Sequence, residues 1–175
     1  MVKQSKLLNK TEMKNFKNIY FTIIAILSLA TANAQISKAE IRATGLTCSM
    51  CSNAINKQLK SLPEVANVDT DLNTNTFFVT LKKNNSLSPK IFKEKVEKAG
   101  FFIGSLIVTM KSENINNKKF ILINDVKANG DDVKVQIMDK DYVTAKEYKK
   151  LLKSLKSITT YSANNQDDFH VKIVN

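Results

Sequence analysis

The stretch Gly45-Leu46-Thr47-Cys48-Ser49-Met50-Cys51 decides the fold of this chain and contains its only two cysteines. On its N-terminal side, residues 39–44 alternate apolar and polar side chains, which predicts a β-strand with one buried face. On its C-terminal side, apolar residues recur at helical spacing and stop before Pro63. The recurring residues are Cys51, Ala54, Ile55, Leu59 and Leu62. They predict a helix from about Cys51 to Ser61, so the cysteines lie where a strand gives way to a helix.

Three further strand patterns follow this helix. Residues 64–72 and 75–83 alternate apolar and polar side chains and are joined by the turn-forming segment Asn73-Thr74-Asn75, which predicts a hairpin. Residues Phe101 to Met110 are mostly apolar and predict the last strand of this block. Within that strand, Phe102 is expected to be a core residue.

A second helix is expected between the hairpin and the last strand. Ser86 or Ser88 can cap it, Pro89 falls in its first turn, and Gly100 stops it. Its apolar stripe comprises Phe92, Val96 and Ala99. The order βαββαβ over residues 38–110 predicts an α+β fold, a ferredoxin-like sandwich with both helices on one face of the sheet.

The C-terminal part of the chain has a different pattern. A polar, asparagine-rich segment at 111–118 is typical of a linker, and it divides the predicted domain at 35–111 from an extension at 112–175. In the extension, strand patterns at 118–125 and 131–139 flank a turn-like sequence, a helix is expected at 144–157, and a strand closes the chain at 169–174. The inward side chains of that helix are expected to be Tyr148, Leu151, Leu152 and Leu155. This ββαβ extension has no assigned role and could be an independent unit or pack on the first block.

The N-terminal residues predict export. A basic segment from Lys14 precedes an apolar run from Ile19 to Ala30 and the small-residue pattern Ala32-Asn33-Ala34, so residues 1–34 read as a secretory signal peptide, with Met13 as an alternative start. The apolar run falls short of the roughly 20 residues that span a bilayer, so no stable membrane anchor is expected after cleavage. The prediction is a secreted or periplasmic protein.

The chain is basic, with a formal net charge of +11 that would fall to +7 on removal of residues 1–34. Its lysines are scattered without interleaved aromatic residues or a nucleic-acid-binding motif, so nucleic acid is not an expected partner. The charge predicts either a solvated basic surface or steering of an acidic partner.

The spacing of Cys48 and Cys51 lets both sulfur atoms approach one small ion above the N-terminus of a helix. Free backbone N–H groups and the positive end of the helix dipole lower the pKa of nearby thiols, which makes thiolates available near neutral pH. Two thiolates in an exposed loop form a soft site of low coordination number, which favours Cu(I) over hard cations. A structural zinc site usually has four protein ligands, and His170, the single histidine, is distant in the sequence and is expected to be an ordinary strand residue.

The motif within this pattern resembles the GMTCxxC motif of heavy-metal-associated domains, which occur in copper chaperones, copper-transporting ATPases and the periplasmic mercury-binding protein. The resemblance covers about residues 38–110 and implies that Cys48 and Cys51 are the metal ligands. Leu46 replaces the usual methionine as a buried loop anchor, and Phe101 falls where the family places an aromatic residue or lysine close to the loop. Met50 is expected to be an exposed variable position. The implied partner is a metal donor or acceptor, such as a metal-transporting ATPase or another heavy-metal-associated domain.

The predicted function is therefore binding of Cu(I), or of another thiophilic ion, through Cys48 and Cys51 for metal transfer or sequestration. Hg(II) capture and Zn(II) binding remain alternatives within this class. A thiol-disulfide redox role is the alternative outside it, because a CxxC pair in an oxidising compartment can form a disulfide. A purely structural disulfide between the two cysteines is disfavoured, because the small loop that it would close constrains little of the unfolded chain. We find no enzyme signature in the sequence.

Overall fold

A computed structural model describes residues 36–47, 49–115, 119–124, 126–128, 130–163 and 168–174. The predicted signal peptide, the alternative start at Met13 and the candidate ligand Cys48 lie outside the described residues. Among the helices of the described part, none is long and apolar enough to cross a bilayer.

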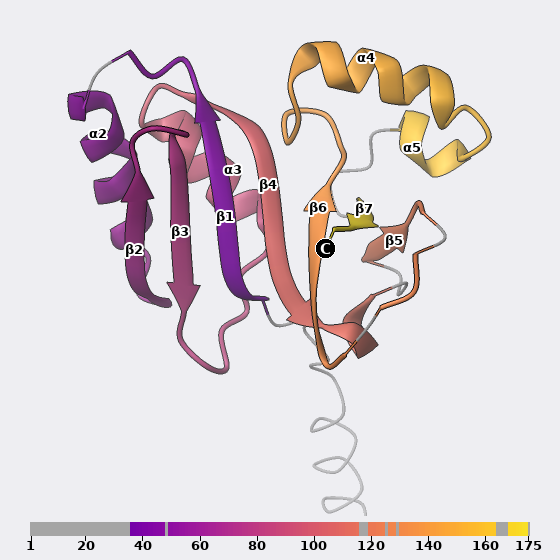
Figure 1. The fold of residues 1–175 in the computed structure, drawn as a ribbon, viewed down its shortest axis with the longest axis horizontal. Helices are drawn as coiled ribbons and strands as arrows, with labels where there is room; N and C mark the ends of the chain where they lie inside the picture. Colours follow the sequence, from indigo (N-terminus) through magenta and orange to yellow (C-terminus); the bar gives the residue numbers. More distant parts are fainter. Residues whose placement is uncertain are drawn as a thin grey trace, which may run out of the picture. The chain divides into compact units, whose positions relative to one another are not determined.

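The first half of the described chain has the predicted order βαββαβ (Figure 1). Its elements are β1 (Ile36–Thr44), α2 (Ser49–Lys60), β2 (Val65–Asp71), β3 (Thr76–Leu81), α3 (Pro89–Lys98) and β4 (Phe102–Lys111). The strands form an antiparallel arrangement in the order β2-β3-β1-β4. Figure 1 shows α2 and α3 behind the same face of these strands. The α+β, ferredoxin-like prediction is confirmed.

The second half adds strands to the same sheet. After the short 3-10 helix η1 (Ser112–Asn114) come β5 (Phe120–Leu122), β6 (Asp132–Ile137), α4 (Ala145–Ser154), α5 (Thr159–Ala163) and β7 (Phe169–Ile173). The full order is β2-β3-β1-β4-β6-β7-β5, with β6 antiparallel to β4 and β5 parallel to β7. The predicted ββαβ extension is therefore present with one additional short helix, α5, and it continues the first sheet. The boundary at residue 111 stays a prediction.

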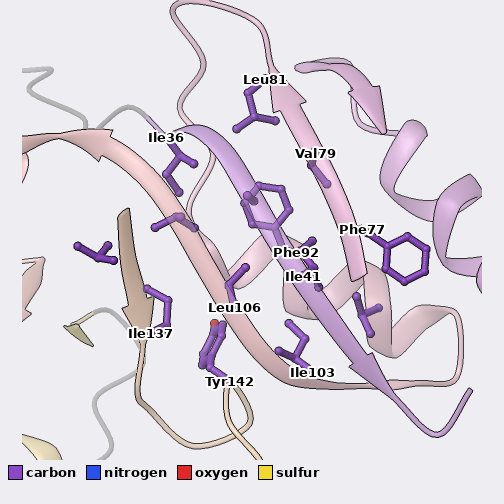
Figure 2. Packing of buried hydrophobic residues seen from close by; sticks show 14 of the residues in the cluster. Ile36, Ile41, Phe77, Val79, Leu81, Phe92, Ile103, Leu106, Ile137 and Tyr142 are labelled. Carbon is purple, nitrogen blue, oxygen red and sulfur yellow. The ribbon is translucent and has the colours of Figure 1, made fainter. Parts of the chain in front are cut away.

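The buried residues of the core are largely those that the strand and helix periodicities predicted. Ala39, Ile41 and Ala43 are buried on one face of β1, as their alternation predicted. Ile55 and Leu59 of α2 and Phe92 and Val96 of α3 are fully buried, and Figure 2 shows Phe92 beside side chains of the sheet. The same cluster of buried residues includes members from the extension, among them Phe120, Val135, Ile137, Tyr142, Phe169 and Val171.

Two side-chain predictions for helices need adjustment. Ser88 is the N-cap of α3 and Pro89 follows it, but the Ser88 side chain makes no capping hydrogen bond. In α4 the predicted inward residues are only half-buried, and no residue of this helix is fully buried. The apolar side of α4 is therefore only partly buried.

The prediction that Phe102 is a core residue is wrong, because its side chain is 68% exposed. The pairing of β1 with β4 shifts at this point, since Arg42 pairs with Ser105 and Ala43 pairs with Ile103. Gly104 is thus the extra residue of a β-bulge, and a bulge reverses the alternation of faces beyond it. Ile103 consequently points into the core, and Phe102 points away from it.

A hydrogen-bonded cluster around His170 fixes β7 against the segment that follows β6. His170 is 2% exposed, and its Nδ1 lies 2.7 Å from Oδ1 of Asp139. The other carboxylate oxygen of Asp139 accepts the backbone N–H of His170 at 2.7 Å, and Nε2 of His170 lies 2.9 Å from the hydroxyl of Thr160. Both ring nitrogens of His170 are therefore engaged within the fold, in agreement with its expected role as a strand residue.

Replacement of Asp139 by alanine should destabilise the fold, because it removes the acceptor of two hydrogen bonds at the buried His170. Leaving buried donors without partners costs about 1–3 kcal/mol. Urea unfolding followed by circular dichroism measures the loss. The exposed Asp131→Ala variant is the matched control, and equal stability of the two variants would contradict the structural role of Asp139.

Two buried tyrosines should make stability fall at alkaline pH. Burial raises the pKa of Tyr142 and of Tyr161 well above the ordinary value of 10.0, and Asp139 adds to both shifts. Because these phenols ionise more readily in the unfolded chain, their contribution to stability is complete below pH 10.0 and is lost as the pH rises above it. Absorbance at ultraviolet wavelengths should show both tyrosines still protonated in the native protein at about pH 11. Ionisation of every tyrosine near the ordinary value would contradict this.

Candidate metal centre

The predicted metal loop connects β1 to α2, as the sequence predicted. Gly45 follows the last residue of β1 with a φ of +87°, a left-handed conformation that favours glycine. Leu46 is partly buried and packs against the core cluster, which is the anchoring role expected for it. The loop therefore leaves the sheet through a turn and is held by one apolar side chain before α2 begins at Ser49.

Cys51 lies in the first turn of α2, and its side chain is partly buried. The first turn of α2 contains no acidic residue. The positive end of the helix dipole favours a thiolate at this position, and no acidic residue of the first turn opposes it. Because Cys48 lies outside the described residues, the structure places one of the two predicted ligands and leaves the other as a prediction from the sequence.

The helix that carries Cys51 is fixed against the sheet. Ile55 and Leu59 are fully buried beneath it, and the side-chain amide of Asn56 donates to the hydroxyl of Thr70 in β2 at 3.0 Å. Ser52, next to Cys51, is also buried. The first turn of α2 therefore projects from a rigid support, which suits a site that must hold its ligands in place.

The surroundings of the loop are mainly apolar. Met50 is 78% exposed, as expected for a variable position. Phe101 is partly buried against the core, and its Cδ1 lies 3.9 Å from the position that a Cβ on Gly45 would occupy. Phe101 thus lies beside the loop, where the resemblance placed it. Its neighbour Phe102 is exposed at the start of β4, which the sequence analysis did not predict.

Within the described ranges, no three or more histidine, cysteine, aspartate or glutamate side chains converge on a common point. His170 is hydrogen-bonded to Asp139 and Thr160 in the extension, where it serves the fold. The donor set that the sequence predicts at the loop is the pair of cysteine thiolates. Such a pair suits a soft ion, whereas a structural zinc site prefers four ligands.

Comparison with known proteins assigns a family to the region that holds the loop. Residues 40–102 match the heavy-metal-associated domain family. A search of curated proteins found no match. Among solved structures, the yeast copper transporter domain Ccc2a, determined in apo and Cu(I)-loaded states, is 37% identical over 37% of this chain and 88% of its own, with a TM-score of 0.34.

A second similar structure is the N-terminal domain of a potential copper-translocating P-type ATPase from Bacillus subtilis in its Cu(I)-loaded state. It is 33% identical over 38% of this chain and 82% of its own, with a TM-score of 0.34. The family match spans β1 from Glu40 through the first residue of β4, and thus includes the whole loop and both helices of the βαββαβ unit. Residues 40–102 of this chain are therefore a heavy-metal-associated domain.

Proposed function

We propose that this protein binds one thiophilic metal ion, Cu(I), between the thiolates of Cys48 and Cys51 and transfers it to another protein. The observation that carries the proposal is the position of Cys51 in the first turn of α2, directly after the loop, within the heavy-metal-associated domain. Cys48 precedes it by three residues in the sequence. The metal is cargo, and the proposed role is binding and transfer without catalysis.

The choice of Cu(I) rests on the donor set. Thiolates are soft ligands that suit Cu(I) and Zn(II), and two of them leave Zn(II) short of its usual four ligands, whereas carboxylate and carbonyl oxygens suit harder cations. Two thiolates also leave the ion with a low coordination number. An incoming thiolate from a second protein can therefore bind the ion before an outgoing thiolate leaves, so that transfer proceeds by ligand exchange without release of free metal.

We also propose that the protein acts outside the cytoplasm, in the periplasm or after secretion. The support is the sequence of residues 14–34, with its basic start, apolar run and small-residue cleavage pattern. In an oxidising compartment the empty cysteine pair can close to a disulfide, so the metal must reach it in the reduced state. Mass spectrometry of the protein from its natural compartment should give an N-terminus at Gln35, and an intact N-terminus in the cytoplasm would contradict export.

Titration of the reduced protein under anaerobic conditions tests the metal proposal. We expect one Cu(I) per chain, bound tightly enough to compete with a chromophoric Cu(I) chelator, and weaker binding of Zn(II). Tighter retention of Hg(II) than of Cu(I), with no Cu(I) transfer to a second thiol protein, would favour mercury capture. No stoichiometric binding of any of the three ions, together with catalysed thiol-disulfide exchange, would overturn the proposal in favour of a redox role.

A further inference from the structure

A hollow of about 590 Å³ lies at the end of the sheet where β1 ends and β4 begins. One wall comes from the heavy-metal-associated domain and the other from the extension, where it consists of the segment 140–144 and the N-terminal half of α4. The residues on which the argument depends are Thr44 and Phe102 on the first wall, and Lys140, Thr144, Tyr148 and Lys149 on the second. This hollow is called the α4 groove below.

The α4 groove begins one residue from the metal loop. Thr44, the last residue of β1, precedes Gly45, and its hydroxyl donates to the carbonyl of Phe102 at 3.3 Å. Phe102 in turn follows Phe101, which lies beside Gly45. Any molecule seated in the groove therefore contacts residues that adjoin the loop of Cys48 and Cys51.

The groove is preformed because the extension is fixed to the domain around it. Lys93 of α3 pairs with Asp141 at 3.6 Å, and its Nζ lies 5.9 Å from the centre of the Tyr142 ring. Val143 forms a β-bridge with Ser105 of β4. These contacts hold the segment that leads into α4, and the hydroxyl of Thr144 then caps α4 by accepting the N–H of Glu147 at 3.3 Å.

Gly104 lets the two walls approach each other. A Cβ on this residue would lie 2.6 Å from Cγ2 of Thr44 and 3.9 Å from Cγ2 of Thr144. A side chain at this position would therefore have to displace Thr44 beside the metal loop. The bulge at Gly104 also turns Phe102 outward, so the same residue accounts for the exposed aromatic side chain of the groove.

The surface chemistry around the groove indicates a protein partner with an acidic surface. Helix α4 carries four lysines, Lys146, Lys149, Lys150 and Lys153, against one acid, Glu147. A second copy of this basic chain would bring like charges together, which disfavours self-association at this face.

The shape of the surface at the α4 groove favours a protein over a membrane as the partner. A membrane-binding amphipathic helix presents large apolar side chains that protrude into the lipid. On α4 the corresponding residues are half-buried, and among the described residues the large exposed apolar side chains lie on other segments, with Phe102 the one that lines the groove. The groove is a hollow beside one exposed aromatic residue, which suits insertion of a side chain from a folded partner.

We infer that the α4 groove is the docking site of an acidic protein that exchanges metal with this chain, with an apolar side chain of that protein inserted between Phe102 and Tyr148. The lysines of α4 steer the acidic surface toward the groove that adjoins the loop. This inference rests on the proposed transfer function, and it assigns to the extension the task of selecting the partner.

Photo-crosslinking in the cells that express the protein tests the inference. A benzophenone amino acid replaces Phe102 in one variant and Phe78, an exposed phenylalanine of β3 outside the groove, in the control. We expect position 102 to crosslink to a protein with a net negative charge and position 78 not to do so. Crosslinks from position 102 to lipid or to a second copy of the chain, or no crosslink at all, would overturn the inference.

The second readout is the rate at which Cu(I) is transferred to the partner protein, once that protein has been identified by crosslinking and purified. Phe102→Asp should slow transfer by at least about tenfold, because it removes an apolar contact and adds a charge that repels an acidic partner. The matched control Phe78→Asp should transfer at the rate of the unmodified protein. Equal rates for both variants would overturn the inference. Cu(I) affinity is measured on the same samples, so failure of metal binding would contradict the proposed function separately.

Discussion

Replacement of either Cys48 or Cys51 by serine is expected to lower the Cu(I) affinity by more than about 100-fold. Loss of an outer-shell partner of a metal ligand already costs about 10- to 100-fold in affinity, and here a ligand itself is lost. A serine hydroxyl is a hard donor that stays protonated near neutral pH, so it does not replace a thiolate at a soft ion. The measurement is an anaerobic competition titration against a chromophoric Cu(I) chelator.

Met50 provides the matched control for these variants. It lies between the two cysteines and is 78% exposed, so its replacement by alanine removes a sulfur atom from the same loop without disturbing the core. We expect Met50→Ala to change the Cu(I) affinity by less than about threefold, within the range for an exposed position outside the ligand set. A loss in Met50→Ala as large as that in the cysteine variants would contradict a site of two thiolates.

The sequence predicted the first half of the fold because its elements are amphipathic. The alternation in β1 and the helical stripes of α2 and α3 each depend on residues close together in the chain, and each element buried the face that its pattern indicated. The start of α2 was misplaced by two residues, at Cys51 instead of Ser49. The first turn of this helix carries little apolar signal, so periodicity alone does not mark where it begins.

Phe102 and the α4 groove show why the rest could not be predicted. Successive residues of a strand face opposite sides, and the register of β1 with β4 decides whether Phe102 or Ile103 is buried. That register shifts at Gly104, a feature of the pairing between strands distant in the sequence. The groove likewise depends on the contact of Lys93 with Asp141, and the strand order of the extension depends on the parallel pairing of β5 with β7. Hydropathy patterns contain no information on such long-range pairs.

The candidate site was predicted from one local motif, which explains why the sequence indicated the cysteine pair but not the surface next to it. The spacing of the cysteines and the strand-to-helix junction are properties of consecutive residues, and the structure places Cys51 as that junction required. The α4 groove, which adjoins the loop at Thr44, is assembled from β4, the segment around Asp141 and α4, which come together through tertiary contacts. The sequence therefore predicted the ligands, whereas the neighbouring groove required the structure.

Replacement of Phe92 by alanine is expected to lower the free energy of unfolding by about 3–5 kcal/mol, the usual cost of removing a fully buried phenylalanine side chain. Phe92 is 0% exposed and projects from α3 toward the sheet (Figure 2), so its loss leaves a cavity that the surrounding strands cannot close without disrupting their ladder.

Urea unfolding measures the effect of Phe92→Ala, and Phe102→Ala is the matched control because the same side chain is removed from a position that is 68% exposed. We expect the control to remain within about 0.5 kcal/mol of the unmodified protein. A loss below about 1 kcal/mol in Phe92→Ala, or equal losses in the two variants, would contradict the burial of Phe92 in the core and the exposure of Phe102. The same pair of variants thus tests the core of the domain and the exposed aromatic residue from which the docking of a partner was inferred.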